Sequence, residues 1–218
     1  DEALFYVDKT LENGWSRAVL MNFLDTQLYA AQGKAITNFS KYLPEPMSDL
    51  AQQTLKDPYN FDFLTMRENY NERELEDALT KNITRFLLEL GSGFAFVGRQ
   101  VRLEINGNEF FIDLLFYHLK LRCYVVIELK VTEFKPEYLG QLGFYVTAIN
   151  KQMKRKEDSP TIGLIICKTK DRIIAEYALE GTNQPLGISQ YDLVKIMPDE
   201  LKNTLPSIEE IENKLNEE

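Results

Sequence analysis

The chain has 218 residues, of which 44% are hydrophobic, and its formal net charge is −9. This length suits one medium-sized domain with an appendage. No apolar run approaches the ~18–20 residues of a membrane span, so we expect a cytoplasmic protein with no membrane partner. The charge is uneven, because residues 81–172 hold 15 Lys/Arg and 10 Asp/Glu whereas the remainder has a balance of −14. The acidic average therefore does not exclude a nucleic-acid partner for the mildly basic middle.

The first 66 residues have the pattern of a helical region. Ser16 is placed to cap a helix whose apolar residues recur at helical spacing, and Gly33 follows as a stop. A Pro-punctuated stretch then leads to a linker at 57–58. Because the chain begins at Asp1 rather than Met, we expect residues 1–66 to be the end of a larger helical domain. The wide apolar face of its main helix indicates a homodimer contact or a contact with preceding residues.

The next elements alternate between helices and strands. The stretch 71–93 predicts one long helix that ends in glycines. Asn106-Gly107, a strong hairpin signal, joins a strand at about 94–105 to one at about 109–118. A second tight reversal at 119–122 leads to a third strand, 123–130, and a helix follows over 135–156. A buried strand at 161–168 should lie parallel to its neighbour, because a helix separates it from the hairpins.

A short helix, a marginal strand "GISQYDLV" and an acidic C-terminal helix over 206–218 complete the chain. The resulting order α-β-β-β-α-β over residues 67–205 predicts an α/β fold with a mixed sheet. Cys123 and Cys167 lie in apolar strands, which is typical of buried free thiols in a reducing compartment.

The strands of the apolar hairpin "FFIDLLFYHLKLRCYVVIELK" carry Asp113, Glu128 and Lys130, in addition to the two cations at its turn. Side chains alternate along a strand, so Glu128 and Lys130 share a face. If the second hairpin reverses around Lys120, Asp113 lies beside Glu128. Two buried carboxylates repel each other and cost desolvation energy, which a hard divalent cation offsets. The alternative is a structural salt bridge between Asp113 and Lys130.

A third acid follows from the same geometry. The first hairpin places Asp113 opposite Gln100, and the preceding helix runs back along that strand. A strand advances ~3.3 Å per residue and a helix ~1.5 Å per residue. The helix therefore reaches the height of Gln100 near residue 78. Glu76 is the nearest acid on the buried face, with Glu72 and Glu74 as alternatives.

At this point the sequence resembles a known family. The strings "FIDLLFYH" and "VVIELK" are similar to the D…(D/E)-x-K signature of the PD-(D/E)xK nuclease superfamily, whose fold is restriction-endonuclease-like. The longer pattern "ELGSGFAFVGRQ…EYLGQLGFYV…TIGLIICKTK" resembles the bacterial YhcG-like family over about residues 70–205. The proline that names the superfamily motif is absent, because Phe111-Ile112 precede Asp113.

The resemblance implies roles for particular residues. Asp113, Glu128 and Glu76 would bind Mg²⁺, for which Mn²⁺ can substitute, and Lys130 would position or activate the attacking water. Gln141 and Tyr145 resemble a Gln-x-x-x-Tyr motif that faces the same site, where Tyr145 would also contact nucleic acid. The alternative for this pair is a helix face that packs on the sheet.

A basic cluster closes the same helix, and its cations could hold a DNA backbone. A solvated helix end, where cations are favoured, is the alternative. The cluster comprises Lys151, Lys154, Arg155 and Lys156.

These features predict a metal-dependent nuclease, in the first place a DNA endonuclease. Two alternatives stay open: a catalytically weak nucleic-acid-binding or scaffold module on the same fold, and an RNA nuclease. His118 is the only histidine. It ends a strand and is interpreted as a hairpin residue rather than a catalytic base.

Overall fold

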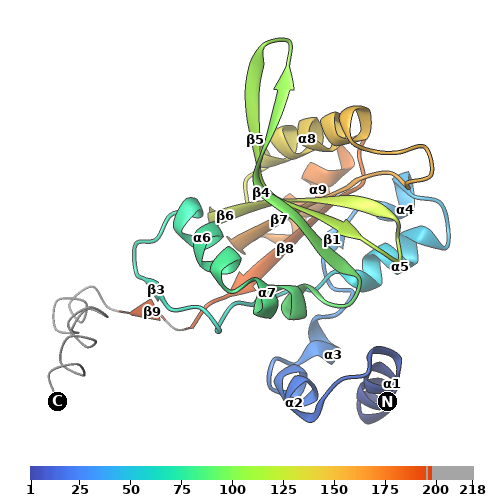
Figure 1. Cartoon of the computed structure of the whole chain (residues 1–218), viewed down its shortest axis with the longest axis vertical. Coiled ribbons are helices and arrows are strands. Elements are labelled where there is room, and N and C mark those ends of the chain that lie inside the picture. Colours follow the sequence, from blue (N-terminus) through green and yellow to red (C-terminus); the bar gives the residue numbers. More distant parts are fainter. Residues whose placement is uncertain (195, 198–218) are drawn as a thin grey trace, which may run out of the picture.

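The computed structural model describes residues 1–194 and 196–197. Its main sheet has the strand order β1-β8-β7-β6-β5-β4 (Figure 1). β4, β5 and β6 are antiparallel neighbours, whereas β7 and β8 run parallel to β6. The predicted α-β-β-β-α-β order and mixed sheet are therefore confirmed. The core strands are β4 (Phe94–Ile105), β5 (Asn108–His118), β6 (Cys123–Glu133), β7 (Ile162–Thr169) and β8 (Leu186–Asp192).

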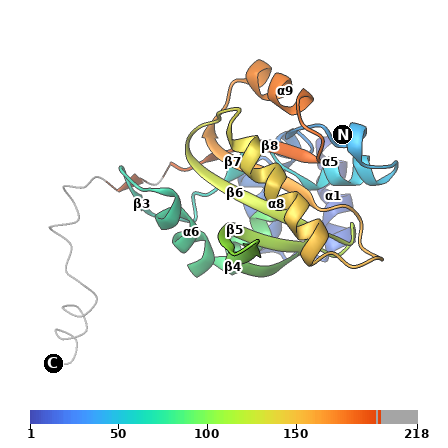
Figure 2. The same cartoon turned by 90° about the horizontal axis from the view of Figure 1, so that it is seen from above.

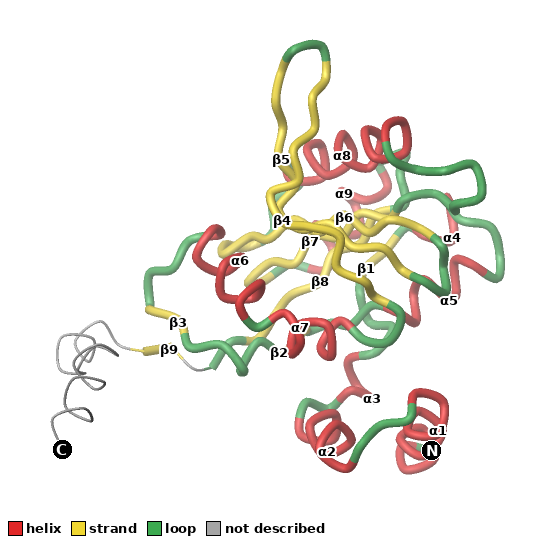
Figure 3. Tube along the Cα trace, viewed as in Figure 1, coloured by secondary structure: helices red, strands yellow, loops and turns green. Residues whose placement is uncertain are grey.

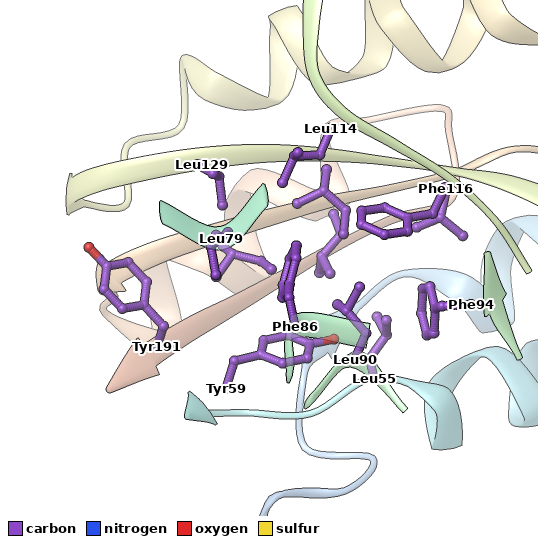
Figure 4. Close-up of a cluster of buried hydrophobic side chains, with 14 of the residues drawn as sticks. Leu55, Tyr59, Leu79, Phe86, Leu90, Phe94, Leu114, Phe116, Leu129 and Tyr191 are labelled. Atoms are coloured by element: carbon purple, nitrogen blue, oxygen red, sulfur yellow. The ribbon is translucent and has the colours of Figure 1, made fainter. Parts of the chain in front are cut away.

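Helices cover both faces of this sheet (Figure 2). On one face α6 (Glu72–Lys81) and α7 (Ile83–Leu90) pack on the buried residues of β5, β6 and β7. On the other face lie α8 (Tyr138–Gln152) and α9 (Arg172–Glu180). Figure 4 shows the first of these cores, in which the Phe86 and Phe116 rings meet edge to face with centroids 5.7 Å apart.

The prediction of one helix over 71–93 is wrong, because the helix breaks at Asn82. The Asn82 side chain donates a hydrogen bond to the Ala78 carbonyl at 3.0 Å, and its backbone N–H is shared between the carbonyls of residues 78 and 79. Short polar side chains compete in this way with the helical backbone ladder. The break lets α6 and α7 approach the sheet separately.

The N-terminal region is only partly the helical appendage that the sequence predicts. α1 (Glu2–Asn13), α2 (Arg17–Asp25) and α3 (Leu28–Ala31) form a small cluster of their own (Figure 3). Ser16 caps α2, since its hydroxyl accepts from the Val19 N–H.

Residues 32–66, by contrast, belong to the main domain. β1 (Ile36–Thr37) pairs antiparallel with β8, and β2 (Tyr59–Asn60) pairs parallel with it. Tyr59 and Phe61 lie fully buried in the main core. An all-helical appendage up to residue 66 is therefore wrong, and two-residue strands are too short to show the periodicity that would have revealed them. α4 (Phe39–Tyr42) and α5 (Met47–Thr54) lie between these strands.

The homodimer contact through the N-terminal helices stays a prediction. The helix that the sequence predicted for this contact, over 17–32, is divided in the structure into α2 and α3. Its exposed large apolar residues are Met21, Leu24 and Tyr29.

The remaining short strands, β3 (Met66–Arg67) and β9 (Ile196–Met197), pair with each other. The predicted C-terminal helix over 206–218 lies outside the described residues. Among those that are described, no helix combines the length and apolar character needed to cross a membrane.

The contact between α8 and the sheet depends on a glycine in β7. A Cβ atom at Gly163 would come within 2.6 Å of Leu186 and 2.8 Å of Leu142. We expect Gly163→Ala to lower the free energy of unfolding by about 1–3 kcal/mol, because an overpacked core must shift its neighbours.

Urea denaturation measures this change, with Gly140→Ala as the control. A Cβ atom at Gly140 meets nothing within 4 Å, and alanine favours a helix over glycine by up to about 1 kcal/mol. Equal unfolding free energies for Gly163→Ala and wild type would contradict the close approach.

Candidate active site

The pairing of β5 with β6 brings two carboxylates together. Leu114 and Ile127 form the last pair of the β5–β6 ladder, and Asp113 and Glu128 are the residues that follow this pair on the two strands. The backbone N–H of Asp113 donates to Glu128 Oε1 at 3.4 Å, and the Leu129 N–H donates to Asp113 Oδ2 at 3.0 Å. The predicted adjacency of the two acids is present in the structure.

Lys130 lies on the same face of β6 as Glu128. Its Nζ is 3.6 Å from Glu128 Oε2 and 5.2 Å from the ring centroid of Tyr138 at the start of α8. The Tyr138 hydroxyl is in turn 3.0 Å from the Thr132 hydroxyl. The ammonium is thus held between a carboxylate and an aromatic face, an attractive arrangement for a cation. Sequence reasoning missed Tyr138, which carried no signal beyond its position near a helix start.

Burial and neighbouring negative charges make both carboxylates reluctant to ionise. Burial raises the pKa of Glu128, which is 2% exposed, to about 8, with Asp113 adding to the shift and Lys130 opposing it. Burial also raises the pKa of Asp113, against the hydrogen bond from the Leu129 N–H and the charge of Lys130. One nearby cation does not offset the cost of placing two acids here.

Glu76 reaches the site through Gln100. The Gln100 amide nitrogen donates to Glu76 Oε2 and, at 3.3 Å, to Asp113 Oδ1. Burial raises the pKa of Glu76, which is 2% exposed. The alternative acid Glu72 lies close by, where its Oε1 accepts from the Val131 N–H at 3.4 Å. α6 therefore presents acids to this end of the sheet, as the helix-strand geometry predicted.

Gln100 has an unusual backbone. Its φ is 45°, a left-handed conformation that is uncommon for residues other than glycine. It follows an irregularity in the β4–β5 pairing between Phe96 and Gly98. Bulges of this kind re-aim side chains next to functional sites. The register identified Gln100 as the partner of Asp113, but nothing in the sequence indicated that its amide would join two carboxylates.

In the described part of the chain, no three His, Cys, Asp or Glu side chains are gathered as ready ligands for one metal ion. The joint ligand set of Glu76, Asp113 and Glu128 therefore stays a prediction. The donor chemistry of the site nevertheless fits a divalent metal, because its groups are hard carboxylate oxygens whose repulsion a cation would offset.

The motif on α8 faces the carboxylates. Gln141 is exposed and donates through Nε2 to the Tyr145 hydroxyl at 3.0 Å. Burial raises the pKa of Tyr145, and the charges of Glu128 and Asp113 add to the shift. Tyr145 is 4% exposed and its hydroxyl supports Gln141. Its contact with nucleic acid stays a prediction.

The basic cluster lies away from the carboxylates. α8 ends at Gln152 rather than at 156, so three of the four cations belong to the turn that follows. Tyr145 is near the two carboxylates, and Lys151 is six residues farther along the helix, which corresponds to ~9 Å. The cations are exposed or half-buried at that end: Lys151, Lys154, Arg155 and Lys156.

His118 has the structural role that the sequence predicted. Its Nδ1 accepts from the Leu121 N–H at 3.1 Å and so closes the second hairpin. Burial lowers the pKa of His118 to about 4, which keeps the ring neutral. Both cysteines are free and buried, as expected.

A mixed α/β sheet that presents an Asp…Glu-x-Lys set from neighbouring strands defines a nuclease domain of the PD-(D/E)xK class. The family profile described as the YhcG PDDEXK nuclease domain matches residues 52–206, more than half of the chain, which therefore belongs to that family. The match begins before residue 66, in agreement with the packing of residues 32–66 into the domain.

Similar proteins include a curated relative and two solved structures. The chain is 36% identical to "Putative nuclease YhcG" of Escherichia coli K12 over 96% of its own length, but spans only 58% of that relative. A repair endonuclease from Pyrococcus abyssi is 18% identical with a TM-score of 0.37, covering 60% of this chain and 50% of that one. An EndoMS–dsDNA complex is 15% identical with a TM-score of 0.38, covering 58% and 45%.

The raised pKa of Glu128 predicts how stability depends on pH without metal. Between the ordinary value of 4.5 and about 8, the folded state binds more protons at this carboxyl than the unfolded chain does. The free energy of unfolding should therefore fall as pH rises through this window. In chelator, we expect Glu128→Gln to reduce this fall by on the order of 2 kcal/mol or more.

Urea denaturation from pH 5 to 8 measures the slope. Glu133→Gln, which changes an exposed acid on the same strand, should keep the slope of the wild type. If Glu128→Gln and the wild type lose stability equally across this range, Glu128 does not titrate as a buried carboxyl.

Proposed function

We propose that this domain hydrolyses phosphodiester bonds in DNA with a divalent metal, Mg²⁺ or in its place Mn²⁺. The observation that carries the proposal is the adjacency of Asp113 and Glu128, two acids on neighbouring strands with one ammonium 3.6 Å from Glu128. A structural ion pair needs one acid and one base. Two acids that resist ionisation beside a single lysine favour a site whose missing charge is a metal ion.

Each residue then has a defined part. Asp113 and Glu128 would hold the metal, and Glu76 would join them from α6. A bound divalent cation would supply Lewis acidity toward the phosphate and lower the pKa of a bound water. Lys130, steadied by Tyr138, would donate a hydrogen bond to the attacking water or to the phosphate. Gln141 would orient a water or phosphate oxygen at the mouth of the site.

We further propose that the cations at the far end of α8 hold the nucleic-acid backbone. They begin ~9 Å along the helix beyond Tyr145, so they would contact phosphates that flank the cleaved bond rather than the cleaved phosphate itself. Such contacts strengthen binding without sequence preference and weaken as salt increases.

The direct test is cleavage of supercoiled, linear and branched DNA and of RNA, with Mg²⁺, with Mn²⁺ and in chelator. Metal-dependent cleavage of DNA supports the proposal. Cleavage of RNA but not of DNA would make RNA the substrate. Tight binding without cleavage under every condition would favour the catalytically weak module.

Removing either strand carboxylate should abolish cleavage without abolishing DNA binding. Asp113→Ala and Glu128→Ala each delete a proposed metal ligand, whereas the distant cations remain. Cleavage assays and fluorescence anisotropy measure the two properties, and Glu133→Ala serves as the matched control. Cleavage at the wild-type rate in either variant is incompatible with the metal site.

Lys130→Ala should keep metal affinity and lose about 10²-fold or more in cleavage rate, in the range of a lost proton-transfer or charge-stabilising group. Calorimetry measures the affinity and single-turnover cleavage the rate, with Lys135→Ala as the control. If the variant instead loses Mg²⁺ affinity and turns over normally once metal is bound, Lys130 supports metal binding and takes no part in the chemical step.

A further inference from the structure

The side chain of Gln100 lies between the helix acid and a strand acid of the site. Its amide nitrogen donates to Glu76 Oε2 and, at 3.3 Å, to Asp113 Oδ1. Both acceptors are proposed metal ligands, and the charge of Asp113 opposes ionisation of Glu76. In the metal-free fold the partly positive NH₂ group therefore occupies a position between two acids, which is also a favourable position for a cation.

The hydrogen bonds of Asp113 indicate which of its oxygens a metal ion would use. Oδ2 accepts from the Leu129 N–H at 3.0 Å, just beyond the last pair of the β5–β6 ladder. Oδ1 has the Gln100 amide as its partner. The Asp113 oxygen that is not bonded to the backbone is thus the one that Gln100 covers. A metal ion that binds this oxygen together with Glu76 would meet the Gln100 amide.

A side-chain amide has two ends of opposite polarity. Its nitrogen donates hydrogen bonds and repels a cation, whereas its carbonyl oxygen is an acceptable ligand for a hard divalent cation. Half a turn about the Cγ–Cδ bond of Gln100 exchanges these two atoms and leaves the rest of the side chain in place. Torsions of this kind are broad and roughly two-fold. Because Gln100 is exposed, the turn requires no rearrangement of the core.

The backbone and a neighbouring arginine hold this amide at the site. The left-handed conformation of Gln100, with φ 45°, follows the irregularity in the β4–β5 pairing. The adjacent Arg99 bonds Asp77 and lies 3.9 Å from Glu76 Oε1. Two consecutive residues of β4 thus contact the two oxygens of the helix acid. A group that is already in place loses little freedom when it binds a ligand.

We propose that Gln100 is a metal-responsive ligand: its amide nitrogen holds Glu76 and Asp113 together in the metal-free protein, and its carbonyl oxygen turns toward the bound divalent cation. The inference rests on the proposed function and adds one neutral ligand to the acids of that metal site. A neutral oxygen contributes to coordination without adding a further negative charge to the metal-free fold, where neighbouring carboxylates already disfavour one another's ionisation.

Calorimetric titration of the whole chain with Mn²⁺, without nucleic acid, tests this role apart from cleavage. Gln100→Met keeps the length of the side chain but removes both polar atoms of the amide. It should lower Mn²⁺ affinity by about 10- to 100-fold, the range for loss of a group that supports metal binding. Gln100→Glu retains an oxygen at this place and should bind Mn²⁺ at least as tightly as the wild type.

Two more variants control for the fold and for the change of residue type. Gln100→Asn suits the left-handed backbone, which asparagine adopts more readily than most residues, but its shorter side chain withdraws the amide. It should lose Mn²⁺ affinity as Gln100→Met does. Gln53→Met changes an exposed glutamine on α5 and should leave the affinity unchanged.

Nuclear magnetic resonance reports the turn of the amide itself. The side-chain NH₂ signals that vanish from the ¹H–¹⁵N spectrum in Gln100→Met belong to this residue. In chelator, hydrogen bonds to two carboxylates should shift these signals downfield, and saturating Mg²⁺ should return them to positions typical of amides in water. If they stay downfield in Mg²⁺, the nitrogen still donates and Gln100 is not a ligand.

Two further outcomes separate Gln100 from the proposed function. If the wild type binds Mn²⁺ and both Gln100→Met and Gln100→Asn bind it equally well, the ligand role of Gln100 is overturned while the carboxylate site stands. If the wild type binds no Mn²⁺, the proposed metal site fails and the role of Gln100 fails with it.

Discussion

The architecture depends on one constraint: two carboxylates, Asp113 and Glu128, must lie side by side at the edge of a hydrophobic core. β5 and β6 impose this adjacency through their register, and the Leu129 N–H holds one Asp113 oxygen in place. Burial and repulsion oppose ionisation of both groups, and Lys130 offsets only part of the cost. The folded domain therefore carries an electrostatic cost that a divalent cation would relieve. The same adjacency of Asp113 and Glu128 thus explains both the electrostatic cost in the folded domain and the proposed binding of a metal ion.

The strained backbone of Gln100 in β4 helps to hold the acids of the site together. Gln100 adopts a left-handed backbone conformation and joins Glu76 on α6 to Asp113 on β5. Such conformations cost ~1–3 kcal/mol and persist where the surroundings enforce them. Beyond this point the hairpin leaves the sheet and packs on α8. A single irregular residue thus connects the helix acid, the strand acid and the projecting hairpin.

The sequence predicted the elements that local chemistry determines. Asn106 and Gly107 both have positive φ, as their hairpin signal requires, and this turn sets the register of Gln100 and Asp113. The break at Asn82 could not be predicted, because the apolar stripe runs through it without interruption. Tyr145 was placed correctly on the site helix, but its burial depends on the packing between α8 and the sheet. The rises of helix and strand placed Glu76 at the height of Gln100, but not the hydrogen bond between them. The contact of Tyr138 with Lys130 depends on tertiary geometry that no spacing encodes.

The central claim is that the paired carboxylates are a metal site, and diffraction from crystals grown with Mn²⁺ tests it most directly. Anomalous scattering locates the ion independently of any functional assay. The account predicts a peak within ~2–2.5 Å of oxygens from both Asp113 and Glu128. If crystals of Asp113→Asn lack this anomalous peak, the ion is bound by these ligands in the wild type. The contradicting result concerns wild-type protein that cleaves with Mn²⁺. If its crystals show anomalous density elsewhere and none at Asp113 and Glu128, the claim is wrong.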